Sequence, residues 1–90
     1  MAVNAKELEK ILKAVANKRR IEMLRFIRAK REVSVGDIAE EIRISIKAAS
    51  KHLRVLYIAN FVEREQQGVQ VVYRIADDIP EAGRKTLAVI

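Results

Sequence analysis

The spacing of apolar residues changes once along this chain, near residue 60, and that change limits the possible folds more than any other feature. Before residue 60, apolar side chains recur every three to four residues, which is the period of an amphipathic helix. After it, two short segments alternate with a period of two, as half-buried strands do. Helices followed by a strand pair predict a mainly α fold that carries a β-hairpin.

Polar residues that suit helix ends divide the first part of the chain into separate helices. Asn17, Ser34 and Ser45 each precede an apolar-periodic stretch, where a short polar side chain can cap the first turn. Asn60 stands where a helix often ends in a left-handed residue, a conformation that Asn tolerates. We therefore expect helices over 5–16, 18–31, 35–42 and 46–59.

The last third of the chain predicts a hairpin and one more helix. Strands are expected over 62–65 and 70–75, and Gly68 is available for a positive φ in the turn between them. The segment from Asp78 to Glu81 suits a helix start, with Asp78 as the cap and Pro80 in the first turn. The predicted order is α-α-α-α-β-β-α.

Length and composition restrict the class of protein. A chain of 90 residues has room for one domain, over 1–90, and it contains no cysteine, which excludes disulfides and thiolate metal sites. Its longest apolar run covers only residues 55–59, and charges interrupt the N-terminus, so we expect neither a membrane span nor a signal peptide. These features indicate a cytoplasmic protein with no membrane partner.

The formal net charge of +6 favours an anionic partner, and its local distribution says more than the total. Residues 1–33 hold ten Lys and Arg against four Glu. The expected helix 35–42 is acidic, whereas the next helix carries Lys47, Lys51 and Arg54 and no acid. An acidic and then a basic short helix, joined by a tight turn and followed by a hairpin, are the parts of a winged helix-turn-helix.

The basic helix has two distinct faces. Lys47, Lys51 and Arg54 are spaced i, i+4, i+7 and share one face, with Ser50 among them. The buried stripe is expected at Ile46, Ala49, Leu53 and Leu56. A helix that is packed on one side and basic on the other fits the major groove of duplex DNA. Three basic residues on one helix are more often only solvated surface, but the hairpin, the acidic neighbour and the global charge favour DNA.

The order and spacing of several short segments resemble the ArsR-type winged helix regulators. The resemblance covers residues 8–75, and its most specific part is Ser50-Lys51-His52-Leu53-Arg54-Val55-Leu56. The other segments are Ala16-Asn17-x-x-Arg20-Ile21, Ser34-Val35-Gly36-Asp37-Ile38-Ala39, Phe61-Val62 and Val72-Tyr73-Arg74-Ile75.

The resemblance implies a homodimeric transcriptional regulator, usually a repressor, that binds an inverted-repeat operator in double-stranded DNA. By position, the recognition helix would contribute Ser45, Lys47, Ala48, Ser50, Lys51, His52 and Arg54. The wing would contribute Arg64, Gln67, Gly68 and Gln70.

The first and last helices are the expected dimer interface. The resemblance places it there, and the apolar stripes within 1–16 and 78–90 exceed what the core of a 90-residue domain needs. The expected interface residues are Leu8, Ile11, Leu12, Val15, Ile79, Leu87 and Ile90.

Two further groups of residues have open interpretations. Lys18, Arg19 and Arg20, at a helix N-terminus, are expected to meet the DNA backbone. His52 has two interpretations. In the first it donates to a phosphate or helps to pack the recognition helix; in the second it is partly buried and its hydrogen bonds are satisfied within the protein. Tyr57 and Ile58 stand where the family commonly has charged residues. They are expected to extend the core; alternatively, one of them packs under the wing and the other, if exposed, contacts a partner.

No cofactor or metal is expected. The single His and the absence of Cys leave no usual zinc site, and the acidic residues Asp77, Asp78 and Glu81 are explained more simply by capping than by a hard cation. No phosphate-binding glycine loop or nucleophilic constellation points to an enzyme. Whether a small-molecule effector exists is unknown from the sequence. The alternative function is a winged-helix module that binds protein or RNA in a transcription or RNA-processing assembly.

Overall fold

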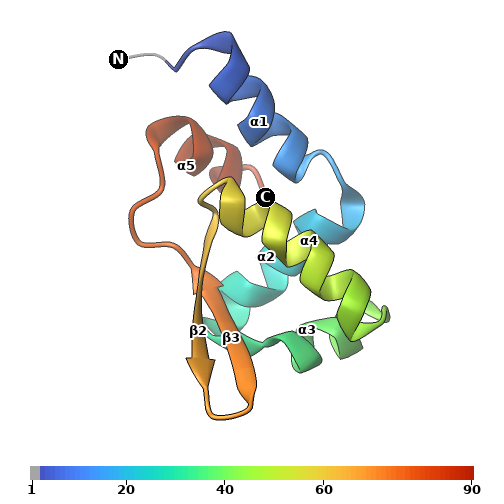
Figure 1. Cartoon of the computed structure of the whole chain (residues 1–90). Helices are drawn as coiled ribbons and strands as arrows, with labels where there is room; N and C mark the ends of the chain where they lie inside the picture. The colour runs from blue at the N-terminus through green and yellow to red at the C-terminus, as the bar shows by residue number, and fades with distance from the viewer. Residues whose placement is uncertain (1–2) are drawn as a thin grey trace.

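Five helices pack beside a small antiparallel sheet in the computed structural model, which describes residues 3–90 (Figure 1). The hairpin lies at the opposite end of the molecule from the N-terminal helix (Figure 1). The predicted fold class, a winged helix-turn-helix, is confirmed. In chain order the elements are α1 (Ala5–Val15), α2 (Lys18–Lys30), β1 (Val33–Ser34), α3 (Val35–Ile42), α4 (Ile46–Ile58), β2 (Val62–Gln67), β3 (Gln70–Ile75) and α5 (Glu81–Ala88).

Local capping fixes where α2, α3 and α4 begin. The side chains of Asn17, Ser34 and Ser45 accept hydrogen bonds from backbone N–H groups three residues later, at 3.1, 3.1 and 3.0 Å. Asn4 caps α1 in the same way, at 2.8 Å. Asn60 adopts a left-handed φ of 66° just beyond α4. The predicted caps at the first three sites and the conformation of Asn60 are confirmed.

The sheet contains one strand that the sequence did not predict. Its order is β1-β3-β2, and the two-residue strand β1 pairs with β3 by placing Val33 opposite Tyr73 and Ser34 opposite Val72. A strand this short has no measurable alternation, so only its pairing with a distant segment reveals it. The pairing joins the end of α2 and the start of α3 to the base of the hairpin.

The last helix begins later than predicted. Its N-cap is Pro80, with no side-chain hydrogen bond, and the proposed cap at Asp78 is therefore wrong. A residue before proline is driven toward extended backbone, so Ile79 cannot be helical without strain. Its side chain is instead buried in the core, only 4% exposed.

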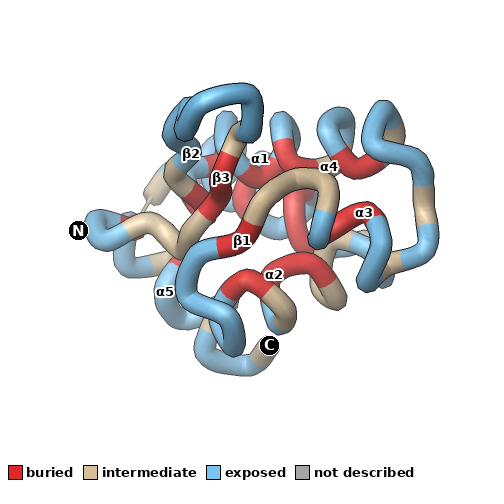
Figure 2. Tube along the Cα trace, turned by 90° about the horizontal axis from the view of Figure 1, so that it is seen from below, coloured by how far each residue is buried: buried red, intermediate tan, exposed pale blue. Residues whose placement is uncertain are grey.

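The core lies where the three central helices meet the sheet. In Figure 2 the buried segments of α2, α3, α4 and β3 gather at the centre, while the tip of the hairpin is exposed. The largest fully buried side chains are Met23, Leu24, Ile27, Ile38, Leu53, Leu56 and Phe61. Within residues 3–90, none of the helices is long and apolar enough to cross a membrane.

The hairpin turn provides a stability prediction. Gly68 has a φ of +63°, and a Cβ added there would meet no atom within 4 Å. Gly68→Ala is therefore expected to act through backbone strain alone and to lower the free energy of unfolding by about 1 kcal/mol. The melting temperature should fall by about 4–8 °C for a domain of this size.

Thermal unfolding followed by circular dichroism measures this effect. Val69→Ala is the control, because Val69 is the neighbouring turn residue and is 100% exposed, without a positive φ. Equal melting temperatures for Gly68→Ala and the unchanged chain would show that the turn tolerates an L-residue.

Candidate nucleic-acid interface

Helix α4 turns its basic face outward because its other face is held in the core. Ala49, Leu53 and Leu56 are fully buried, and Lys47, Lys51 and Arg54 are exposed. Ile46 was predicted in the buried stripe but is 58% exposed, so that part of the prediction is wrong. It lies in the first turn of α4, where the helix projects beyond the core.

A groove separates this basic face from the hairpin. Its volume is about 800 Å³, and it is open to solvent. Apolar side chains from Val35, Val71 and Tyr73 line it together with basic and polar groups. The remaining lining residues are Lys47, Ser50, Lys51 and Arg54 of α4, and Arg64, Glu65 and Gln66 of β2. The predicted basic residues of the helix and of the wing therefore share one concave surface.

One aromatic contact joins the wing to α4. The guanidinium carbon of Arg64 lies 4.0 Å from the centroid of the Tyr57 ring, a cation–π geometry. Tyr57 and Ile58 are 38% and 47% exposed, so the expectation that they extend the core is wrong, and Tyr57 instead makes this contact with the wing. Arg64 therefore faces the groove from a position that the end of α4 helps to fix.

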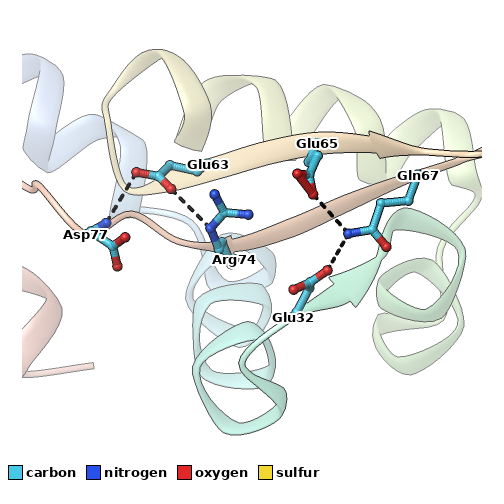
Figure 3. A network of polar contacts seen from close by, with 6 residues as sticks. All are labelled: Glu32, Glu63, Glu65, Gln67, Arg74 and Asp77. Atoms are coloured by element: carbon cyan, nitrogen blue, oxygen red, sulfur yellow. Dashed lines mark hydrogen bonds and ion pairs between the residues drawn. The ribbon is translucent and has the colours of Figure 1, made fainter.

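Polar contacts hold the wing near its tip and at its base (Figure 3). The side-chain amide of Gln67 donates to the carboxylates of Glu32, at 2.6 Å, and Glu65, at 3.0 Å. Arg74 pairs with Glu63 across the hairpin at 3.1 Å. The amide of Gln67, predicted to contact DNA, is thus already used within the protein.

The remaining wing residues lie at the turn. Gly68 and Gln70 are exposed there, and the carbonyl of Gly68 accepts a hydrogen bond from Gln66 at 2.8 Å. Strand β2 carries two acidic residues, Glu63 and Glu65, and one basic residue, Arg64, so its net charge does not favour phosphate. The structure therefore puts most of the positive charge of this surface on α4.

The three basic residues at the start of α2 have different environments. Lys18 is exposed, and Arg19 lies 3.5 Å from the carbonyl oxygen of Ile42 through Nη1. Arg20 is half-buried and donates to three acceptors: Ala14 O at 2.7 Å, Lys13 O at 3.2 Å and His52 Nδ1 at 3.1 Å. Three of the five N–H donors of the Arg20 guanidinium are therefore used within the protein, and the predicted contact of Arg20 with the DNA backbone stays a prediction.

His52 is satisfied locally. It is half-buried on α4 and accepts from Arg20 at Nδ1. Partial burial lowers the pKa of the His52 imidazole, and the nearby charges of Arg20 and Arg19 lower this pKa further. Of the two interpretations of His52, the structure displays the local one, and the second ring nitrogen stays available for another partner.

Other arginines of α2 cap the end of α5. Arg25 Nε donates to the carbonyl of Ile90 at 2.9 Å, and Arg28 Nη1 donates to that of Leu87 at 3.1 Å. The basic excess of the N-terminal third thus partly serves to satisfy carbonyl groups at helix ends. Sequence reasoning missed this role, because the acceptors lie 59 and 65 residues away.

The residues expected at a dimer interface divide into two groups. Ile11, Val15 and Ile79 are buried in the chain's own core, so they are not free to meet a partner. Leu87 and Ile90 are half-buried, whereas Leu8 and Leu12 are 38% and 46% exposed. Val89, which was not predicted at the interface, stands between Leu87 and Ile90 in the sequence and is 83% exposed.

No cluster of three or more potential metal ligands occurs in the part of the chain that the structure describes. The acidic residues at the start of α5 do not converge. Glu81 pairs with Lys85 at 3.3 Å, and the backbone N–H of Asp77 donates to Glu63 at 3.4 Å.

Known proteins share both the sequence pattern and this geometry. A family described as a helix-turn-helix domain matches residues 15–65. HlyU from Vibrio cholerae superposes with a TM-score of 0.80 at 26% identity, over 99% of this chain and 92% of that one.

Two solved structures from Mycobacterium bovis are similar as well. A possible transcriptional regulatory protein matches with a TM-score of 0.79 at 30% identity, over 93% of this chain and 86% of the other. The homodimeric winged helix-turn-helix DNA-binding domain of a possible ArsR-family transcriptional regulator matches with a TM-score of 0.78 at 28% identity, over 99% and 85%.

Proposed function

The chain belongs to the ArsR-type winged helix-turn-helix family of DNA-binding transcription regulators, and from that premise we propose that it binds an inverted-repeat operator as a homodimer and represses transcription. One observation carries the proposal. The exposed face of α4 presents Lys47, Lys51 and Arg54 with no acid, and its opposite face is locked in the core. A helix held in this way can enter the major groove with no change in the fold, because its basic face is already exposed.

The proposed contacts are assigned by position in the fold, and Lys47, Ser50, Lys51, Arg54 and Arg64 among them line the groove. Ser45, Lys47, Ala48, Ser50, Lys51 and Arg54 of α4 and its cap face the bases and the nearest phosphates. Lys18 and Arg19 meet the backbone at the start of α2, and the wing contributes Arg64, Gly68 and Gln70. Affinity then comes mostly from phosphate contacts, and specificity from the few side chains that reach base edges. His52 can add a donor through Nε2.

The dimer is proposed to form through α1 and α5. Leu8 and Leu12 on α1 and Val89 after α5 are exposed apolar side chains. Helix α1 lies at the end of the molecule opposite the wing tip (Figure 1). A two-fold axis there would present two α4 helices about 34 Å apart, one turn of DNA. The homodimeric relative from Mycobacterium bovis supports a homodimer.

Leu12→Lys is expected to convert the dimer to a monomer, because it would bury an unpaired charge in an apolar interface. Multi-angle light scattering at micromolar concentration should change from twice the 10.3 kDa chain mass to 10.3 kDa. Val69→Lys makes a similar change at the fully exposed wing tip and should leave the dimer intact. A 10.3 kDa species for the unchanged chain would contradict the proposed dimer.

Selection of bound sequences from a random duplex library tests the DNA-binding proposal directly. The expected result is an inverted repeat whose half-sites lie one helical turn apart, with affinity that falls steeply as salt rises. A promoter carrying the selected site should lose transcription when the protein is present. No duplex binding even at low salt would overturn the function.

A further inference from the structure

Three helices meet at the guanidinium of Arg20. It accepts no hydrogen bonds, and its donors reach the last carbonyl groups of α1, at Lys13 and Ala14, and the imidazole of His52 on α4. These carbonyl groups follow the last intrahelical bonds of α1 and would otherwise lack a donor. Arg20 itself stands in the first turn of α2, where its backbone N–H donates to Asn17 at 3.1 Å.

This contact dictates the protonation state of His52. A guanidinium has only donors, so the Nδ1 atom that faces it at 3.1 Å must offer a lone pair. A neutral imidazole that accepts at Nδ1 carries its proton on Nε2. His52 is thereby fixed in one tautomer, with the N–H bond directed away from Arg20.

We propose that Arg20 is a positioning residue for DNA binding, which ties α4 to the end of α1 and holds His52 as the neutral Nε2–H donor. The inference rests on the proposed function, in which α4 is the recognition helix and α1 belongs to the dimer interface. Dimerisation and the placement of α4 are then connected through one side chain, because any shift of the end of α1 moves two of the acceptors of Arg20.

Acid should break this connection. A protonated His52 would present an N–H to Arg20 and place two cations 3.1 Å apart. The other charged groups that line the hollow around His52 are Lys18, Arg19 and Glu22 of α2, whereas α3 contributes only Ile42. Lys51 precedes His52 on α4 itself.

The direction of the stability change follows from the lowered pKa of His52. The unfolded chain takes up a proton near the ordinary value of 6.5, while the folded chain still resists it. The contribution of His52 to stability is therefore fully present above pH 6.5 and is lost as the pH falls from there toward the folded-state pKa.

Nuclear magnetic resonance of the imidazole tests the contact without DNA, because the chain contains a single His. Long-range proton–nitrogen spectra of the free protein should show an unprotonated Nδ1 and a protonated Nε2, with a pKa below 6.5. In Arg20→Met the pKa should rise and the tautomers should mix. An Nδ1–H tautomer in the unchanged chain, or an identical titration in Arg20→Met, would overturn the proposal.

Duplex binding tests the positioning role. Arg20→Lys keeps the charge but loses the planar fork that reaches three acceptors, so affinity for the selected duplex should fall roughly tenfold, or about 1.4 kcal/mol. A residue that served only as a phosphate charge would tolerate this change. Unchanged affinity in Arg20→Lys would therefore overturn the positioning role and leave the proposed function standing.

Two His52 variants test the contact with Arg20 through the free energy of unfolding. Asn at this position offers an acceptor near the place of Nδ1, whereas Gln offers an amide near the place of Nε2. His52→Asn should keep the unfolding free energy near that of the unchanged chain, and His52→Gln should lower it. Equal stabilities of the two variants would contradict the contact between Arg20 and Nδ1 of His52.

Absence of duplex binding by the unchanged chain, together with the expected spectra, would overturn the proposed function and with it the DNA-binding role of Arg20.

Discussion

Lys51→Glu is expected to weaken binding to the selected duplex by at least about 100-fold at moderate salt. Lys51 lies in the middle of the basic face of α4 and lines the groove between α4 and the wing. Loss of one specific contact costs about 1–3 kcal/mol, and the proposed dimer loses the contact twice. The introduced carboxylate also repels the phosphates. Fluorescence anisotropy with a labelled duplex, across a salt series, measures the loss.

Folding should be unaffected by this change, because the side chain of Lys51 is exposed and makes no hydrogen bond or ion pair within the described residues. Lys6→Glu is the matched control. It changes the net charge by the same amount on α1, where an acid in the first turn is favoured by the helix dipole. If the two variants lost affinity equally, binding would depend on overall charge, and α4 would not be the reading helix.

Phe61→Ala is expected to lower the free energy of unfolding by about 3–5 kcal/mol, since a fully buried ring is replaced by a methyl group and leaves a cavity. Phe61 lies where α4, the wing and α5 meet. Its backbone N–H donates to Leu56 O and its carbonyl accepts from Ala76, each at 3.0 Å. Domains of this size are stable by only about 5–15 kcal/mol, so the variant should lose much of its stability.

Urea denaturation followed by circular dichroism measures this loss. Phe61→Leu retains most of the apolar volume and should be destabilised much less. Gly83 makes the site tight, because a Cβ on it would lie 3.7 Å from the ring of Phe61 and 2.7 Å from Ile79. A loss under about 1 kcal/mol in Phe61→Ala would show that the surrounding side chains collapse into the space.

The starts of α2, α3 and α4 were predicted from the sequence because they depend on contacts three residues apart. Asn17, Ser34 and Ser45 each accept from the backbone of their own helix, so a short polar side chain before an apolar stretch is enough to locate the start. The burial of Ala49, Leu53 and Leu56 was predicted for a similar reason, since a helix places such spacings on one face.

The errors concern residues whose state depends on distant neighbours. Strand β1 exists only because β3 lies beside it. Ile46 has the spacing of a core residue but lies beyond the reach of the core. Asp78 has the chemistry of a cap, but Pro80 and the burial of Ile79 displace the helix start.

The sequence by itself determined the five helices, the hairpin, their order and the basic face of α4, because hydrophobic period, capping and charge spacing act within one or two helical turns. Only the tertiary structure decided the use of the remaining basic residues. Arg20, Arg25 and Arg28 are as basic as Lys51, yet their guanidinium groups bond to carbonyl oxygens at the ends of α1 and α5. An arginine donates to whichever acceptor the fold brings near it, and the residues next to it in the sequence do not reveal which acceptor that is.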